Sequence, residues 1–472
     1  MARALGVGAR RGKRIVRPKA DEASSTAATA PRLALARAAA YPQIQMDAAP
    51  PREKDPLLWT ALIALGFLAL VWHRLGIPSK IYFDEVHYVP AARKLLQMVS
   101  ANPEHPMLGK EIIAAAIWAL GDQPLYWRVP SALFGAFGLF AFGRLMWWAS
   151  LRRFATLSGV FLVATSFAWF IQSRIAMLDM FMATFGMVAL WQFAAALRSP
   201  ARTARWRLAV TGVCFGLAMG AKWSIAPAAA LPGLAFLVLR LRDHGRHAFS
   251  RSDTRPVPGI SLIEAAFWLG SVPLIVYWLT YLPTFFYPEN AVAWWDFVGR
   301  HRYMLELQDS VKKLHPYRSV WYEWVINWRA IWYLYENVDG AQRGVLLIGN
   351  PFSMLAGLPA LLWCFWSGLR RGRTDMLAFA LLYVASLGMW LVSGKPIQFY
   401  YHYLLPGTFL MGCLALALDE LQRKGGRWEW IPAVSLATAG GMFVWFYPII
   451  SSAVLHEGKQ AYVHWMWLHS WR

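Results

Sequence analysis

Charged residues are scarce in this sequence of 472 residues. Asp, Glu, Lys and Arg make up 15% of the chain and hydrophobic residues 57%, whereas charged residues approach about a quarter of a soluble protein. The three cysteines, Cys214, Cys364 and Cys413, all lie within apolar runs and are predicted to be packing residues. No Cys-x-x-Cys or His-Glu-x-x-His spacing accompanies them, so these cysteines are not expected to have a metal or redox role. The composition predicts a membrane protein.

Nucleotide-binding motifs are also absent. The chain has no Walker A sequence, no Rossmann fingerprint and no Asp-x-Asp metal motif, which disfavours nucleotide-sugar chemistry of the soluble, metal-dependent kind. The net charge of +21 would indicate nucleic-acid binding in a soluble protein. Here most of it falls on the N-terminal tail and on Arg-rich connections, where anionic headgroups are the expected partners and nucleic acid is not.

Apolar segments recur along the chain after residue 56, and most approach the roughly 20 residues that a bilayer requires. They predict an all-α polytopic membrane protein with about eleven transmembrane helices, at Leu57–Leu75, Trp127–Ser150, Phe154–Ile171, Ala176–Leu197, Leu208–Gly220, Trp223–Leu239, Leu262–Leu282, Gly344–Trp366, Met376–Val392, Phe399–Leu418 and Trp430–Ile450.

Arginine occupies every second connection between these segments, which predicts that those connections are cytoplasmic. Residues 1–56 are then a disordered basic cytoplasmic tail, residues 57–453 a transmembrane catalytic domain, and residues 454–472 an outer C-terminal segment. The outer side holds two large loops, 76–126 and 283–343. Because Leu108–Leu120 is too short to span comfortably, it is predicted to be an interfacial helix in the first of these loops.

Two adjacent acids, Asp84 and Glu85, follow the first apolar segment on the outer side. Carboxylates beside aromatic groups tend to have a raised pKa, which suits a general base. A solvated interfacial pair without catalytic function explains the same two residues.

Cations follow at the same predicted face. His105 and Lys110 lie in a Pro-rich turn before the interfacial helix, and Arg128 stands at the outer mouth of the second span. Each suits an anionic group, although Lys110 could equally be a snorkelling lysine and Arg128 an interfacial anchor.

Asp179 is predicted to lie within the membrane, where a carboxylate is costly and pairs with a base. Arg174 and Lys222 are the candidate partners. A structural ion pair without a catalytic part is the alternative.

Aromatic residues gather in the second outer loop and before the tenth span, and they fit either a membrane-interface belt or a carbohydrate-binding surface. The polar residues among them are His315, Tyr317, Lys395 and His402. Cations suit a phosphate, aromatic rings a sugar and the bilayer a polyprenyl chain.

Several blocks together resemble the protein O-mannosyltransferases, membrane enzymes of the GT-C class that use polyprenyl (dolichyl) phosphate mannose. The blocks are Phe83-Asp84-Glu85, His105-Pro106-Met107-Leu108-Gly109-Lys110, the segment 128–135, His315-Pro316-Tyr317 and Tyr401-His402-Tyr403. Met107 stands where the family has a second proline. The loop 283–343 is too short for a MIR domain, so the chain resembles bacterial members.

The resemblance implies a GT-C fold and an inverting transfer of mannose to Ser or Thr hydroxyls of secreted proteins, with Asp84 as the base. It implies that Glu85 and His105 orient sugar or acceptor, that Arg128, Arg174, Lys222 and Lys395 hold the phosphate, and that His315 and Tyr317 line the acceptor groove. Lys110, Asp179 and His402 complete the predicted substrate site.

The expected partners are polyprenyl-phosphate mannose, membrane lipid and acceptor proteins emerging at the translocon. The expected location is the plasma (inner) membrane, with the N-terminus cytoplasmic and the site outside. No cofactor is predicted, since the lipid-linked sugar is a substrate. Two alternatives remain: a GT-C transferase that moves another sugar, such as an aminoarabinose, to a glycolipid, and a non-catalytic lipid-linked sugar flippase.

Overall fold

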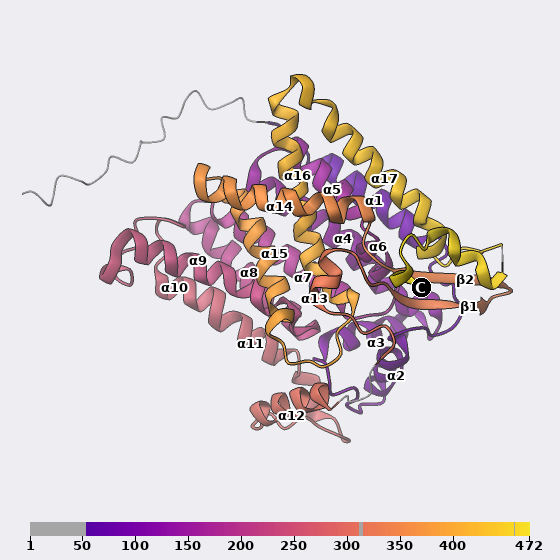
Figure 1. Ribbon diagram of the computed structural model, residues 1–472. Coiled ribbons are helices and arrows are strands. Elements are labelled where there is room, and N and C mark those ends of the chain that lie inside the picture. The colour runs from indigo at the N-terminus through magenta and orange to yellow at the C-terminus, as the bar shows by residue number, and fades with distance from the viewer. Residues whose placement is uncertain (1–52, 311–314, 457) are drawn as a thin grey trace, which may run out of the picture. The chain divides into compact units, whose positions relative to one another are not determined.

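The structure is a computed structural model and describes residues 53–310, 315–456 and 458–472 (Figure 1). Residues 1–52 of the predicted tail therefore lie outside the described residues. The last residues of that segment pack on the helical domain: Asp55 pairs with Arg144 of the second span at 2.6 Å, and Glu53 lies 3.8 Å from Arg152.

Eight helical segments of the described chain are long and apolar enough to cross a membrane, by length and composition. They are α4 (Pro124–Ser150), α7 (Asp179–Ala196), η1 (Trp223–Ile225) with α9 (Ala226–His244) and η2 (Gly245–His247), α10 (Leu262–Ala266) with the π-turn η3 (Phe267–Ser271) and α11 (Val272–Leu279), α14 (Pro351–Arg371), α15 (Thr374–Val392), η5 (Tyr400–Tyr403) with α16 (Leu404–Lys424), and η6 (Gly426–Trp428) with α17 (Trp430–Ile450).

The other helical elements are shorter, more polar, or outside the bundle. They are α1 (Leu57–Trp72), α2 (Glu85–Leu96), α3 (Leu108–Leu120), α5 (Arg153–Ala164), α6 (Phe167–Gln172), α8 (Ala201–Ala221), η4 (Leu282–Phe286), α12 (Phe297–Asp309), α13 (Trp321–Val325), η7 (Gly458–Trp465) and η8 (His469–Trp471).

All eleven predicted apolar segments are mainly helical, and eight of them meet the length and composition expected of a span. The remaining three are α1, the broken pair α5–α6, and α8, which begins with several arginines. The predicted helix in the first outer loop is confirmed with its bounds, as α3.

The start of the eighth predicted segment was wrong. Residues 344–347 belong to strand β2 (Ala341–Leu347), which pairs antiparallel with β1 (Ile331–Val338), and the helix begins only at Pro351. The turn is Asp339-Gly340, with φ of 52° and 72°. Two residues with positive φ form the turn that suits the twist of a hairpin, so the Asp-Gly pair was the missed signal.

The break between α5 and α6 has an identifiable partner. Asn350 is fully buried, and its side-chain amide donates to the carbonyl of Thr165 at 3.2 Å and to that of Ala439 in α17 at 2.9 Å. A helix interrupted inside an apolar bundle needs such acceptors and donors, because unpaired backbone groups are costly there. Asn350 therefore joins the broken helix to α17 at the start of α14.

The connections between helices separate into two groups at the two ends of the bundle. At one end, Arg198 donates to the carbonyls of Trp148 and Ala149, and Arg373 pairs with Asp375 and Glu420. At the other end lie α2, α3, α12 and the β1–β2 hairpin (Figure 1). The Arg-rich connections and the predicted site residues are thus segregated, as the alternation of charge indicated.

Candidate active site

The loop before α2 is fixed by Glu85. This carboxylate is fully buried, and it accepts two hydrogen bonds from the Arg128 guanidinium in α4, at 2.7 and 2.8 Å. It also accepts from the backbone N–H groups of Ala176, at 3.0 Å, and Tyr82, at 3.3 Å. Glu85 therefore joins three segments and has no exposed oxygen for a substrate.

Arg128 is fully buried as well, and all five of its N–H groups have acceptors. Besides Glu85, the guanidinium donates to the carbonyls of Leu75 at 3.2 Å, Pro78 at 2.8 Å and Lys80 at 2.8 Å. An arginine has five donors, so none is left for a phosphate. The structure places Arg128 as the residue that shapes the connection from α1 to α2.

Arg174 caps the end of α1 in a similar way. Its guanidinium donates to the carbonyls of Val71 at 2.6 Å, His73 at 2.8 Å, Arg74 at 3.2 Å and Ser451 at 3.4 Å. The last carbonyls of a helix have no partner within the helix and are often paired with basic side chains. The predicted pairing of Arg174 with Asp179 is not observed.

Lys110 is fully buried in α3, and its ammonium group donates to the carbonyls of Ala101 at 3.2 Å, Asn102 at 2.6 Å and His105 at 2.9 Å. Burial lowers the pKa of Lys110 to about 7. With its three N–H groups engaged, Lys110 folds the preceding loop back onto α3. That loop carries His105 on the wall of a cleft.

Asp84 differs from these residues, because its carboxylate has no hydrogen bond or ion pair with another residue of the described chain. It follows Phe83, whose positive φ of 49° turns the chain just before α2. Burial raises the pKa of Asp84 to about 6, and the positive charge of Lys222 opposes that rise. Asp84 is thus a carboxylate that a small pH change can protonate.

Lys222 and Asp179 form a buried ion pair, with the ammonium 2.8 Å from both carboxylate oxygens. The predicted pairing of Asp179 with Lys222 is confirmed. The Lys222 ammonium also lies 4.9 Å from the ring centre of Tyr401, over the aromatic face. Asp179 thus neutralises most of the lysine's charge.

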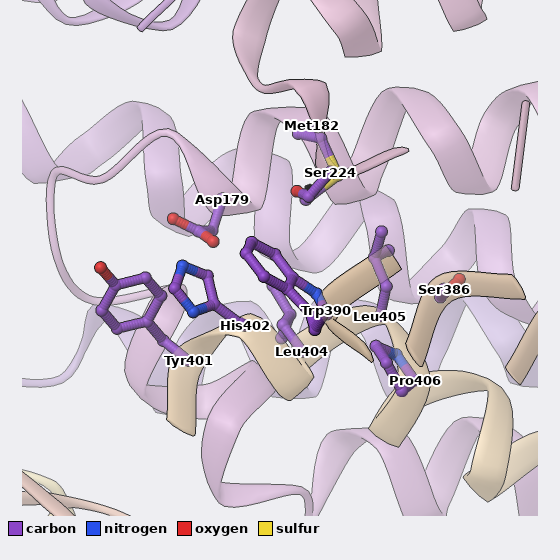
Figure 2. A pocket seen from close by; sticks show the side chains of 10 residues that line it. All are labelled: Asp179, Met182, Ser224, Ser386, Trp390, Tyr401, His402, Leu404, Leu405 and Pro406. Carbon is purple, nitrogen blue, oxygen red and sulfur yellow. Dashed lines mark hydrogen bonds between the residues drawn. The ribbon is translucent and has the colours of Figure 1, made fainter. Parts of the chain in front are cut away.

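A cleft opens beside this pair. Its walls come from the loop before α3, the start of η1, the end of α12 and the end of α15, and the residues are His105, Pro106, Lys222, Trp223, Ser224, Gln308, Met389, Trp390, Ser393, Lys395 and His402. A narrower cavity continues from it and shares Ser224, Trp390 and His402 (Figure 2).

Lys395 is the lysine of this cleft whose ammonium forms no ion pair with another described residue. Burial and the charge of Lys222 lower the pKa of Lys395 to about 8. His402 is buried on the inner wall, stacked on Trp390 at 3.8 Å between ring centres. The cleft is therefore lined by two lysines, Lys222 and Lys395, and by two imidazoles, those of His105 and His402.

His315 and Tyr317 lie apart from the residues that line the two cavities. His315 is exposed, directly after the undescribed residues 311–314, and its ring packs 5.0 Å from that of Phe399. The cleft brings together His105, Lys222, Lys395 and His402 from the predicted set, and Asp179 lines the adjoining cavity.

Sequence reasoning missed Trp390, Ser224 and Gln308. Trp390 lies in a spanning helix, where a tryptophan near the end is typical of the interfacial belt and gives no sign of a cleft. Among the residues that the structure describes, no group of three or more His, Cys, Asp or Glu side chains could hold a metal ion.

Comparison with known structures defines the class of the fold. The chain superposes on the Saccharomyces cerevisiae protein O-mannosyltransferase Pmt1-Pmt2 complex bound to the sugar donor with a TM-score of 0.73, at 14% identity, over 89% of this chain and 93% of that chain. It superposes on ArnT from Cupriavidus metallidurans bound to undecaprenyl phosphate with a TM-score of 0.52, at 16% identity, over 83% and 65%. The fold is that of the GT-C membrane glycosyltransferases, as predicted.

Sequence comparison gives the nearer relatives. A family model described as dolichyl-phosphate-mannose-protein mannosyltransferase matches residues 125–287. The polyprenol-phosphate-mannose–protein mannosyltransferase of Corynebacterium glutamicum is 27% identical over 90% of this chain and 96% of its own length. The protein of that name from Mycobacterium tuberculosis is 24% identical over 88% and 92%. The predicted resemblance to the protein O-mannosyltransferases, and with it the prediction of a glycosyltransferase enzyme, is confirmed.

The Glu85–Arg128 pair generates a stability prediction. Glu85→Gln leaves the buried Arg128 charge without its counter-ion, and such a loss typically costs about 3–5 kcal/mol. We expect a much lower thermal unfolding temperature in detergent micelles.

Asp122→Asn is the matched control, because it breaks an Arg93 ion pair whose side chains are 39% and 42% exposed. Exposed pairs contribute only about 0–1 kcal/mol. Equal unfolding temperatures for the two variants would contradict a structural role for Glu85.

Proposed function

We propose that this chain transfers mannose from polyprenyl-phosphate mannose to Ser or Thr hydroxyls of secreted proteins on the outer face of the plasma membrane. The observation that carries the proposal is the Asp84 carboxylate, which has no partner among the described residues and feels the charges of Lys222 and Lys395, two residues that line the cleft. The names of the relatives, which specify this donor and protein acceptors, support the choice of substrate.

In the proposed reaction, Asp84 accepts the proton of the acceptor hydroxyl as its oxygen attacks the anomeric carbon. The bond between that carbon and the phosphate oxygen breaks on the opposite side, so the configuration inverts. The electron pair of the broken bond stays on the phosphate oxygen, and polyprenyl phosphate departs. A transition state of oxocarbenium character needs a base on the acceptor side and positive charge beside the departing phosphate.

Lys395 is the best placed of the predicted phosphate ligands. Arg128 donates to Glu85 and to backbone carbonyl groups, and Arg174 donates to backbone carbonyl groups alone. Both arginines therefore position the loop rather than bind substrate. Lys222 lines the cleft, but Asp179 holds its ammonium. Lys222 therefore contributes a smaller net charge to the phosphate than Lys395 does.

The two alternatives predict different products. Transfer of another lipid-linked sugar would use the same base and cations, and the names of the relatives favour mannose. A flippase would not need an unpaired carboxylate beside the cleft, so the behaviour of Asp84 separates the transferase from the flippase.

Replacing the proposed base tests the chemistry directly. Asp84→Asn should lower transfer of mannose to an acceptor peptide by about 10²–10⁴-fold, the usual contribution of a general base. The measurement is mass analysis of the peptide after incubation of proteoliposomes with polyprenyl-phosphate mannose. Asp122→Asn is the control carboxylate. Full activity of Asp84→Asn would rule out the assignment.

The pH dependence of kcat/KM tests both charged groups. Asp84 acts deprotonated, so activity should fall as the pH drops through about 6; Lys395 acts protonated, so activity should fall above about 8. Lys395→Arg keeps the positive charge at all accessible pH values. We expect the alkaline fall to disappear in that variant, whereas an unchanged alkaline limb would assign it to another group.

Orientation is tested by labelling single cysteines in sealed spheroplasts, in a background from which the three native cysteines have been removed. A cysteine at Arg371 should react only with reagents that reach the cytoplasm, because Arg-rich connections stay inside. A cysteine at the exposed Trp118 of α3 should react with impermeant reagents from outside. The reverse pattern would invert the proposed topology.

A further inference from the structure

His402 has one ring nitrogen engaged and one without a partner. Its Nδ1 accepts a hydrogen bond from the backbone N–H of Phe399 at 3.1 Å. Its Nε2 is buried and makes no hydrogen bond in the structure, and the whole residue is only 5% exposed. A buried polar atom without a partner is uncommon and calls for an explanation.

The Phe399 contact fixes the tautomer. An imidazole nitrogen that accepts a hydrogen bond cannot carry a proton, so the proton of the neutral ring lies on Nε2. His402 is therefore a neutral N–H donor at Nε2. It needs an oxygen acceptor, and the described chain does not supply one.

The ring is also held in place. It stacks on Trp390 with an interplanar angle of 27°, and the Trp324 ring lies 5.8 Å away. Figure 2 shows the His402 ring beside Trp390 and Tyr401, with the Asp179 carboxylate facing this group. A side chain locked in this way keeps its donor in one direction, as a binding site requires.

The surroundings favour a hydroxyl group as the missing acceptor. His402 lines both the open cleft and the narrower cavity, as Ser224 and Trp390 do, and Asp179 lines the narrower cavity. No lysine or arginine lines the narrower cavity, and Lys222 balances the charge of its Asp179 carboxylate, so this cavity offers a phosphate no net positive charge. A neutral donor beside hydroxyl and carboxylate oxygens matches the alternating donors and acceptors of a sugar.

We propose that His402 Nε2 donates a hydrogen bond to a hydroxyl of the donor sugar, so that it is a specificity-determining residue of the transferase. This inference rests on the proposed function. It places the sugar at the inner end of the cleft and the phosphate toward Lys395. Trp390 acts as a positioning residue that holds the imidazole.

Deoxy analogues of the donor test the inference. Four analogues are compared, the 2-, 3-, 4- and 6-deoxymannosyl polyprenyl phosphates. In the wild-type enzyme, the kcat/KM of one of them should be about tenfold or more below that of the mannosyl compound, because it lacks the hydroxyl that accepts the hydrogen bond from His402 Nε2. In His402→Phe the same analogue and the mannosyl donor should react at equal rates. Unchanged penalties for all four analogues in His402→Phe would overturn the inference.

Two isosteric variants separate sugar binding from a purely structural role. His402→Gln places an amide N–H where Nε2 lies but loses the acceptor for Phe399, whereas His402→Asn keeps that acceptor and loses the distal donor. The loss of kcat/KM for the deoxy analogue should persist in His402→Gln and vanish in His402→Asn. The opposite result would show that His402 supports only the local backbone.

His301→Phe is the matched control, because both ring nitrogens of His301 already have partners, Tyr277 and the carbonyl of Phe297. In this variant the fall in kcat/KM for each deoxy analogue should equal that of the wild type. If His402→Asn weakens binding of sugar-free polyprenyl phosphate as much as binding of the complete donor, the contact is to phosphate and the inference fails. Absence of mannose transfer by the wild type would instead refute the proposed function.

Discussion

The buried ion pair between Glu85 and Arg128 determines the geometry of the whole site. Two opposite charges removed from water must satisfy each other and every remaining donor and acceptor. Here they do so by binding the backbone of three segments: the connection after α1, the start of α2 and the turn before α7. Because Glu85 is fixed in this way, the backbone of the adjacent Asp84 is fixed as well, although its side chain has no hydrogen-bond or ion-pair partner among the described residues.

The cations at this end of the bundle fall into two groups. Arg128, Arg174 and Lys110 are buried and donate mainly to backbone carbonyls, which suits the multiple donors of these side chains. Lys222 and Lys395 line the cleft. Irregular backbone at the edge of a bilayer needs internal hydrogen-bond partners, and the first group supplies them. The positive charge available to a ligand is therefore smaller than the sequence suggests.

The same distinction explains how far sequence alone can predict this site. The lengths of the apolar segments and the Arg-rich connections predicted the helical bundle and α3, because both depend on local composition. The pairing of Asp179 with Lys222 was one of two possibilities, and burial of a carboxylate required one of them. The roles of Arg128 and Arg174 could not be predicted, because they depend on which distant carbonyls reach the guanidinium groups. Trp390 faces the cleft through helix rotation, which spacing does not reveal.

The Lys222–Asp179 pair also influences the pKa of Asp84, the proposed base. A bare lysine near Asp84 would stabilise its ionised form and hold its pKa low, which would make it a weak base. The negative charge of Asp179 offsets that of Lys222, so burial prevails and the pKa of Asp84 rises to about 6. A base of that pKa is mostly ionised at neutral pH and still has appreciable proton affinity. In the proposed reaction the ion pair thus acts through the electrostatic field at Asp84.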